Sequence, residues 1–147
     1  MTDTINKTEI DALNDVTKVL IDSRKGYEKC AELSDESFAF RTQFQKRASD
    51  RAALISRFQQ QVRTLGCEPQ TEGGTLGSLH RALTEFSSMF QDDRKAALEA
   101  IDDGEEHLAD SIKDRLEKSE VQGQSRALLE EAYSSARSGE AFADSLG

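Results

Sequence analysis

The stretch from Ala96 to Leu116 places its apolar residues at the spacing of one helix face. Those residues are Leu98, Ile101, Leu108, Ile112 and Leu116. Steps of three and four residues are typical of an amphipathic helix. Continued through the gap between Ile101 and Leu108, the same spacing places Glu105 on the apolar face. A carboxylate on the core face of a helix predicts either a metal ligand or a buried ion pair.

Helical spacing also runs through most of the remaining chain, which contains one proline, Pro69, and no tryptophan. It predicts helices from Thr8 to about Leu33, from Glu36 to about Leu65, and from the capping-box pattern Ser119–Gln122 onward. A shorter helix is expected over about residues 76–90. We therefore predict an all-α four-helix bundle with an additional short helix in the connection between the second and third bundle helices. Residues 1–147 form one domain in this prediction, with frayed tails at 1–7 and 138–147.

The net charge of −9 argues against binding nucleic acid or an anionic membrane surface. No apolar run approaches the roughly 20 residues of a membrane span. The N-terminus lacks the basic and apolar regions of a signal peptide, so we expect a cytoplasmic protein. Cys30 and Cys67 have no metal-binding or CxxC spacing and are expected to be free thiols.

Four stretches taken together carry a resemblance to a known family. They are a Gly-Tyr-Glu helix, the segment FRTQFQKRASDR before a terminal LG, the segment GTLGSLHRAL, and the segment DDGEEHLADSI. In this order they resemble a group of uncharacterised bacterial, mostly proteobacterial, four-helix-bundle proteins of the ferritin-like class, which are grouped as a domain of unknown function. The resemblance implies a ferritin-like bundle and no assigned activity.

The ligand pattern of ferritin-like di-iron sites is missing from both histidine-containing segments. Such sites take Glu-x-x-His from each of two helices, but Gly77 and Gly104 stand three residues before His80 and His107. A phosphate-binding loop and a recognisable nucleophile–histidine spacing are also absent. We therefore predict no catalytic, cofactor-binding or metal-binding residues. The alternative is an atypical iron or manganese site with the ligands Glu28, Glu105, Glu106 and His107.

A buried ion pair is the competing prediction for Glu105. On the second helix, the core-face spacing includes Arg47 and Arg51. Glu105 aligns with about Ala48 if the two helices run parallel and with about Ala53 if they run antiparallel, so Arg51 is within a turn in both cases. We expect Glu105 to pair with Arg51 and Arg47, with the hydroxyl group of Tyr27 or Tyr133 completing its hydrogen bonds.

Two functional hypotheses follow from these patterns. The first is a non-enzymatic protein that self-associates or binds a protein partner, with a role in stress physiology suggested only by analogy. Phe86, Met89 and Phe90 on the short helix predict an apolar strip and a homodimer. The second is a ferritin-like metal-binding protein or oxidase that uses the atypical carboxylate site.

Overall fold

The computed structural model describes residues 2–34, 38–73, 84–85, 88, 94–118 and 121–146. These residues form four long helices, α1 (Thr2–Leu33), α2 (Phe38–Thr64), α4 (Arg94–Glu117) and α5 (Gly123–Leu146), and contain no strand. The prediction of an all-helical bundle is confirmed. The predicted short helix over about residues 76–90 lies outside the described residues, apart from Thr84, Glu85 and Ser88. None of the described helices has a segment long and apolar enough to cross a bilayer.

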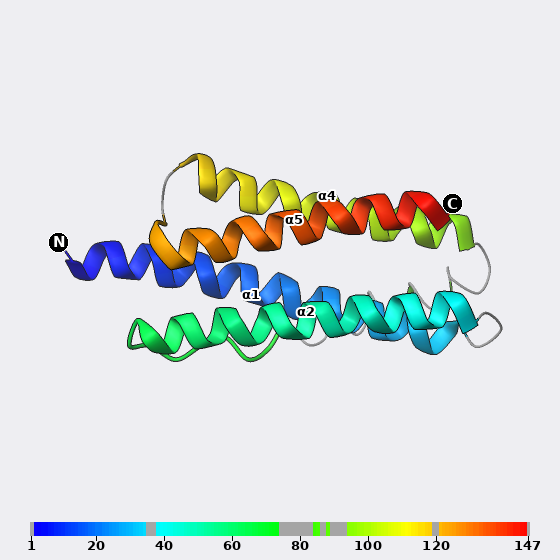
Figure 1. Cartoon of the computed structure of the whole chain (residues 1–147), viewed down its shortest axis with the longest axis horizontal. Helices are drawn as coiled ribbons and strands as arrows, with labels where there is room; N and C mark the ends of the chain where they lie inside the picture. Colours follow the sequence, from blue (N-terminus) through cyan, green and yellow to red (C-terminus); the bar gives the residue numbers. More distant parts are fainter. Residues whose placement is uncertain are drawn as a thin grey trace.

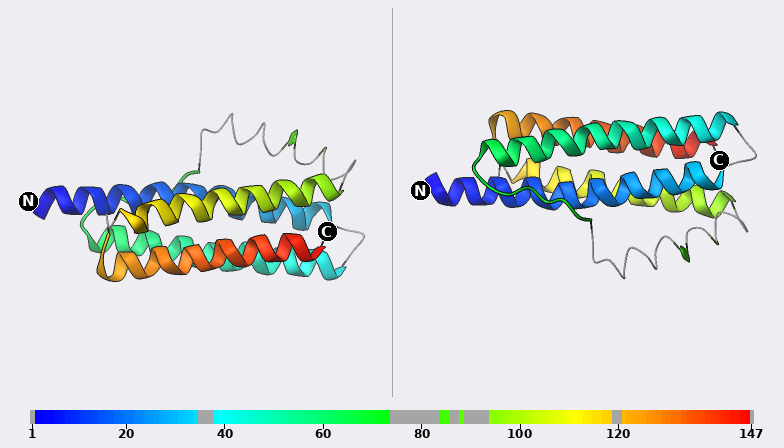
Figure 2. Two further views of the ribbon diagram at one scale, coloured as in Figure 1. Left: turned by 90° about the horizontal axis from the view of Figure 1, so that it is seen from above. Right: turned by 90° about the horizontal axis from the view of Figure 1, so that it is seen from below.

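The helices form two antiparallel hairpins that lie against each other (Figure 1). One hairpin is α1 with α2, and the other is α4 with α5; helices within a hairpin contact each other far more than helices of different hairpins do. Figure 2 shows that α2 ends and α4 begins at opposite ends of the bundle, so that these two helices run parallel. The connection between them must therefore return along the length of the bundle.

The end of α2 is set by Gly66, as the sequence predicts. Gly66 has a φ angle of 89°, which glycine adopts without the steric penalty of a Cβ atom. Its N–H group donates to the carbonyl of Arg63 at 2.9 Å, and the N–H group of Cys67 donates to the carbonyl of Val62 at 3.2 Å. This pair of bonds is the Schellman motif that ends many helices.

After Gly66, the chain returns along the outside of α1. The backbone N–H of Gln70 donates to the side chain of Asn14 at 2.9 Å, and Gln59 donates to the carbonyl of Gln70 at 2.9 Å. Gly73 then lies against Ile21 and Asp22, further along α1. These contacts place residues 66–73 on the path that the connection to α4 requires.

Residues 2–7 and 138–146, within the two segments predicted to be frayed tails, are helical. Helix α1 begins at Thr2, and α5 continues to Leu146. The C-terminal turns of α5 contribute to the interior, because Gly139 and Ala143 are buried and the ring of Phe142 packs edge-on against Phe44, with centroids 5.6 Å apart. The last turns of α5 therefore belong to the core.

The capping-box pattern Ser119–Gln122 predicts that Gln122 lies in the first turn of the last helix, and this prediction is wrong. Gln122 is not helical; α5 begins at Gly123, and the carbonyl of Gln122 accepts from the N–H of Arg126 at 3.4 Å. Val121 is buried in the core instead of occupying a helical turn. Gly123, with a φ angle of 62°, lets the chain turn into the helix after that burial. Ser119 lies outside the described residues.

The apolar interior consists of two clusters at successive levels of the bundle. The larger cluster is centred on Leu13, Leu20, Phe58, Leu108, Ile112 and Leu129. The smaller cluster is centred on Tyr27, Cys30, Phe44, Ala97 and Leu98. In each helix, the residues of both clusters lie on the face that points into the bundle. Polar residues on that face, at the level between the two clusters, are therefore buried as well. Arg51 and Glu105 are among them.

Candidate functional site: a buried polar layer

Four side chains, one from each helix, meet between the two apolar clusters: Ser23, Arg51, Glu105 and Ser135. We call these four residues the polar layer. Each lies on the core face of its helix, because the three- and four-residue steps that bury the neighbouring apolar side chains pass through it as well. In α4, for example, Glu105 lies between Ile101 and Leu108, and Leu108 is fully buried.

The centre of the polar layer is a two-pronged ion pair between Arg51 and Glu105. Nη1 of Arg51 donates to Oε1 of Glu105 at 2.9 Å, and Nη2 donates to Oε2. The relative exposure of Arg51 is 1% and that of Glu105 is 3%. Arg51 belongs to α2 and Glu105 to α4, so the pair joins the two hairpins across the middle of the bundle. A planar guanidinium fits a carboxylate in this fork geometry, which a lysine could not reproduce.

The two serines satisfy the remaining donors of Arg51. Nε donates to Oγ of Ser135 at 3.1 Å, and Nη2 donates to its carbonyl oxygen at 3.2 Å. Nη1 donates to Oγ of Ser23 at 2.6 Å, and the Ser23 hydroxyl approaches Oε1 of Glu105 at 3.4 Å. All five N–H groups of the guanidinium therefore have acceptors. Full satisfaction offsets much of the cost of burying the two charges.

Tyr27 contributes its ring to the polar layer and not its hydroxyl group. The guanidinium carbon of Arg51 lies 5.6 Å from the ring centroid, a cation–π distance. The hydroxyl oxygen is buried and has no hydrogen-bond partner within the described part of the chain. Burial raises the pKa of Tyr27, and the nearby Glu105 carboxylate raises it further. The expectation that a tyrosine hydroxyl completes the hydrogen bonds of Glu105 is therefore wrong for Tyr27.

Tyr133 is not part of the polar layer either. Its side chain is partly buried and packs against the larger apolar cluster. The hydroxyl group that donates to Glu105 is that of Ser23, at 3.4 Å.

Arg47 lies one turn from Arg51 but binds elsewhere. Its Nη2 atom donates to the carbonyl and to the hydroxyl oxygen of Ser138, both at 3.1 Å. Its guanidinium carbon is 4.7 Å from the ring centroid of Phe142. Both partners lie in the segment predicted to be a frayed tail, so the sequence reasoning had no candidate partner there and assigned Arg47 to Glu105.

Gly139 is a site residue that the sequence reasoning missed. It is buried in α5, and a Cβ atom built there would overlap the carboxylate of Glu105. The missing side chain therefore leaves the space that the acid occupies. A signal exists in the sequence: Ala132, Ala136, Gly139 and Ala143 are small residues at helical spacing. Without the position of Glu105, that spacing indicates only close helix packing.

The four alternative metal ligands do not come together. Glu105 is paired with Arg51, whereas Glu106 and His107 are exposed. Glu28 is also exposed and accepts from Nε of Arg24 at 2.7 Å. Among the residues that the structure describes, no group of three or more His, Cys, Asp or Glu side chains could hold a metal ion. A guanidinium occupies the place where the atypical site would need a cation, so these residues do not fit one.

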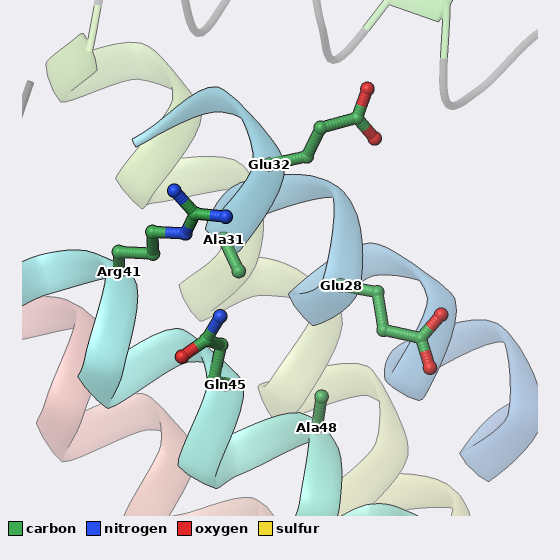
Figure 3. Close-up of a pocket in the computed structure, with 6 residues that line it drawn as sticks. All are labelled: Glu28, Ala31, Glu32, Arg41, Gln45 and Ala48. Atoms are coloured by element: carbon green, nitrogen blue, oxygen red, sulfur yellow. The ribbon is translucent and has the colours of Figure 1, made fainter. Parts of the chain in front are cut away.

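Glu28 instead lines a surface pocket of about 400 Å³ between α1 and α2. Figure 3 shows its carboxylate and that of Glu32 pointing away from Arg41 and Gln45, which line the other side. The pocket brings together no two of the four proposed ligands. It is therefore a surface depression of the first hairpin, separate from the polar layer.

Comparison with known proteins identifies the family. No curated protein matches the chain, and no solved structure matches it. A family model described as a domain of unknown function, DUF2383, matches residues 8–118. The match includes Ser23, Arg51 and Glu105 and ends before α5. Because it covers more than half of the chain, the protein belongs to the DUF2383 family.

Proposed function

We propose that the protein is a bacterial, cytoplasmic bundle of the ferritin-like class that has no catalytic activity and acts through self-association or a protein partner. A role in stress physiology is part of this proposal by analogy with other ferritin-like proteins only. The observation that carries the proposal is the Arg51–Glu105 pair at the middle of the bundle. Di-iron proteins of this architecture use inward-facing glutamates from their bundle helices as ligands.

The connectivity supports the ferritin-like part of the proposal. Two antiparallel hairpins joined by one long crossover connection are typical of ferritin-like bundles, and α2 and α4 run parallel as that connection requires (Figure 2). Within this architecture, Glu105 is an inward-facing glutamate on a bundle helix. Its partner, however, is a guanidinium whose five donors are satisfied by protein atoms. The proposed role of the residue is therefore structural.

Metal analysis and a double-mutant cycle test this proposal together. Protein purified without chelators should contain iron and manganese well below one atom per chain. Glu105→Leu should lower the free energy of unfolding by about 3–5 kcal/mol, because it leaves the Arg51 charge buried and unpaired. Glu105→Leu combined with Arg51→Leu should recover much of that loss, because both charges are removed. Urea unfolding followed by circular dichroism measures each step.

Glu106→Leu is the matched control, since Glu106 is the next residue of α4 and is exposed. It should change the free energy of unfolding by no more than about 0.5 kcal/mol. Stoichiometric iron or manganese that is lost in Glu105→Leu and not restored by Arg51→Leu would overturn the proposal in favour of the metal-binding alternative.

A further inference from the structure

Polar side-chain contacts gather where the two hairpins meet. Contacts of this kind, all between α1–α2 and α4–α5, join Asp15 to Arg115, Ser23 to Glu105, Arg47 to Ser138, Arg51 to Ser135 and Glu105, Arg57 to Glu131, and Gln61 to Ser125. Most of them lie at or near the surface. The pair Arg51–Glu105 is the buried one, with side-chain exposures of 1% and 4%.

The apolar residues alone define the alignment of the hairpins poorly. Each helix presents aliphatic side chains at successive turns of its core face, such as Val16 and Leu20 in α1, Leu54 in α2, and Leu108 and Ile112 in α4. A slip of one hairpin by one turn, about 5.4 Å, would again place aliphatic side chains opposite aliphatic side chains. Cores with suitable hydrophobicity and volume tolerate such rearrangements and lose uniqueness before they lose stability.

The polar layer does not tolerate a slip. One turn away on the core face of α4, Arg51 would meet Ile101 or Leu108 in place of Glu105. Around Ser135, the buried positions one turn away on α5 are Ala132 and Gly139, which have no side-chain acceptor, whereas Glu131 and Ser138 are exposed. A slip in either direction leaves the buried guanidinium of Arg51 without its carboxylate, which is strongly unfavourable. In the direction that brings Arg47 to the level of Glu105, Arg51 still meets the apolar Leu108.

We propose that the polar layer is an alignment device, which fixes how the α4–α5 hairpin docks on the α1–α2 hairpin and adds specificity in place of net stability. Single buried polar contacts set register in coiled coils by the same mechanism. The proposal concerns the docking of the hairpins and is independent of any partner or metal. It predicts that an apolar layer gives a bundle that is folded but no longer aligned in one way.

Distances between spin labels on the two hairpins test this proposal. Labels at Gln60→Cys on α2 and Ser134→Cys on α5 occupy exposed positions of different hairpins. The background carries Cys67→Ser, because Cys67 is exposed, whereas Cys30 is buried and stays unlabelled. Pulsed electron spin resonance should give one narrow distance distribution in this background. With Arg51→Leu and Glu105→Leu added, the helical content should be unchanged, and the distribution should broaden or split by about one helical turn, roughly 5 Å.

The control removes another contact between the hairpins. Arg57 and Glu131 form an ion pair whose side chains are 49% and 48% exposed, and Arg57→Leu with Glu131→Leu should leave the distribution narrow. An unchanged narrow distribution in the apolar-layer variant would overturn the proposal. Loss of helical content in that variant would overturn it as well, because the polar layer would then be needed for stability. The single change Gly139→Ala, which displaces Glu105 without removing a charge, should broaden the distribution in the same direction.

Discussion

At the scale of single residues, the polar layer depends as much on small residues that leave space as on the charged residues that fill it. Arg51 and Glu105 supply the attraction, but the carboxylate fits only because Gly139 leaves its side of α5 empty. The serines are equally small, and their hydroxyl groups reach the guanidinium at 2.6 and 3.1 Å. A buried ion pair is stable only when its remaining hydrogen-bonding capacity is met in this way.

Gly139→Ala is the substitution that isolates this steric contribution. Alanine is a better helix former than glycine by about 1 kcal/mol, so the change would stabilise an unconstrained helix. Here, the added Cβ would overlap the Glu105 carboxylate and force it to move. We expect a net loss of about 1–3 kcal/mol in the free energy of unfolding, as in other overpacked interiors.

Gly104→Ala provides the matched control. Gly104 is also a helical glycine, but it is exposed, and a Cβ atom there would have no neighbour within 4 Å. That substitution should stabilise the protein by about 0.5–1 kcal/mol. Equal effects of the two substitutions in urea unfolding would show that the acid does not need the space at Gly139.

The same small residues mark the limit of what could be predicted from the sequence. The pairing of Glu105 with Arg51 was predictable, because a charged residue among apolar residues at three- and four-residue steps faces the core. A charge in the core has few possible partners. Ser23, Ser135 and Gly139 were not, because serine and glycine are compatible with interior, surface and helix-end positions alike. The end of α2 followed from Gly66, whereas the start of α5 did not, because burial of Val121 outweighed the local capping pattern.

At the scale of helices, α4 and α5 face each other with an excess of acidic side chains. Asp102, Glu106 and Asp110 follow one another at four-residue steps on α4, and Glu140 and Asp144 do so on α5. Glu140 has one buried carboxylate oxygen without a partner in the described residues, and its other oxygen lies 3.4 Å from Arg137. Partial burial raises the pKa of Glu140, and the acids of α4 raise it further, against the opposing effect of Arg137. Partial burial, Asp144 and Asp103 raise the pKa of Asp102.

The raised pKa values of Asp102 and Glu140 predict how the free energy of unfolding depends on pH. An acid whose pKa is higher in the folded state binds protons more readily there, so its contribution favours folding at low pH and is lost as the pH rises through the folded-state pKa. Asp102→Asn with Glu140→Gln should therefore raise the free energy of unfolding at pH 7, by roughly 0.2–0.5 kcal/mol for each like-charged pair removed. The difference from the native protein should shrink as the pH falls towards 4.

Thermal unfolding at several pH values between 4 and 7 checks this prediction. Glu68→Gln, at an exposed loop position, is the control and should have no comparable effect. A gain in stability that is the same at pH 4.5 and pH 7 would assign the effect to packing and not to charge.

At the scale of the whole molecule, each of the four described helices contributes side chains to the interior. The large apolar side chains of the two clusters come mostly from α1, α2, α4 and α5. The sequence nevertheless contains a further amphipathic segment, residues 76–90, with Leu79, Leu83, Phe86, Met89 and Phe90 on one side. Five large apolar side chains are more than one short helix needs to cover a bundle, which favours the burial of some of them in a contact between two copies.

We therefore predict a homodimer whose stability increases with salt. Each copy carries a net charge of −9, so long-range repulsion opposes association, and salt screens it with a Debye length of about 10 Å at 0.1 M. Light scattering should give about twice the 16.3 kDa mass of one chain, with a larger dimer fraction at 0.3 M than at 0.03 M NaCl.

Phe86→Ser with Phe90→Ser should give monomers of unchanged helical content, whereas Ala127→Ser, an exposed position on α5, should leave the dimer intact. The monomer mass at all concentrations and salt levels would contradict the prediction, and a dimer that weakens with salt would indicate ion pairs in place of apolar contact.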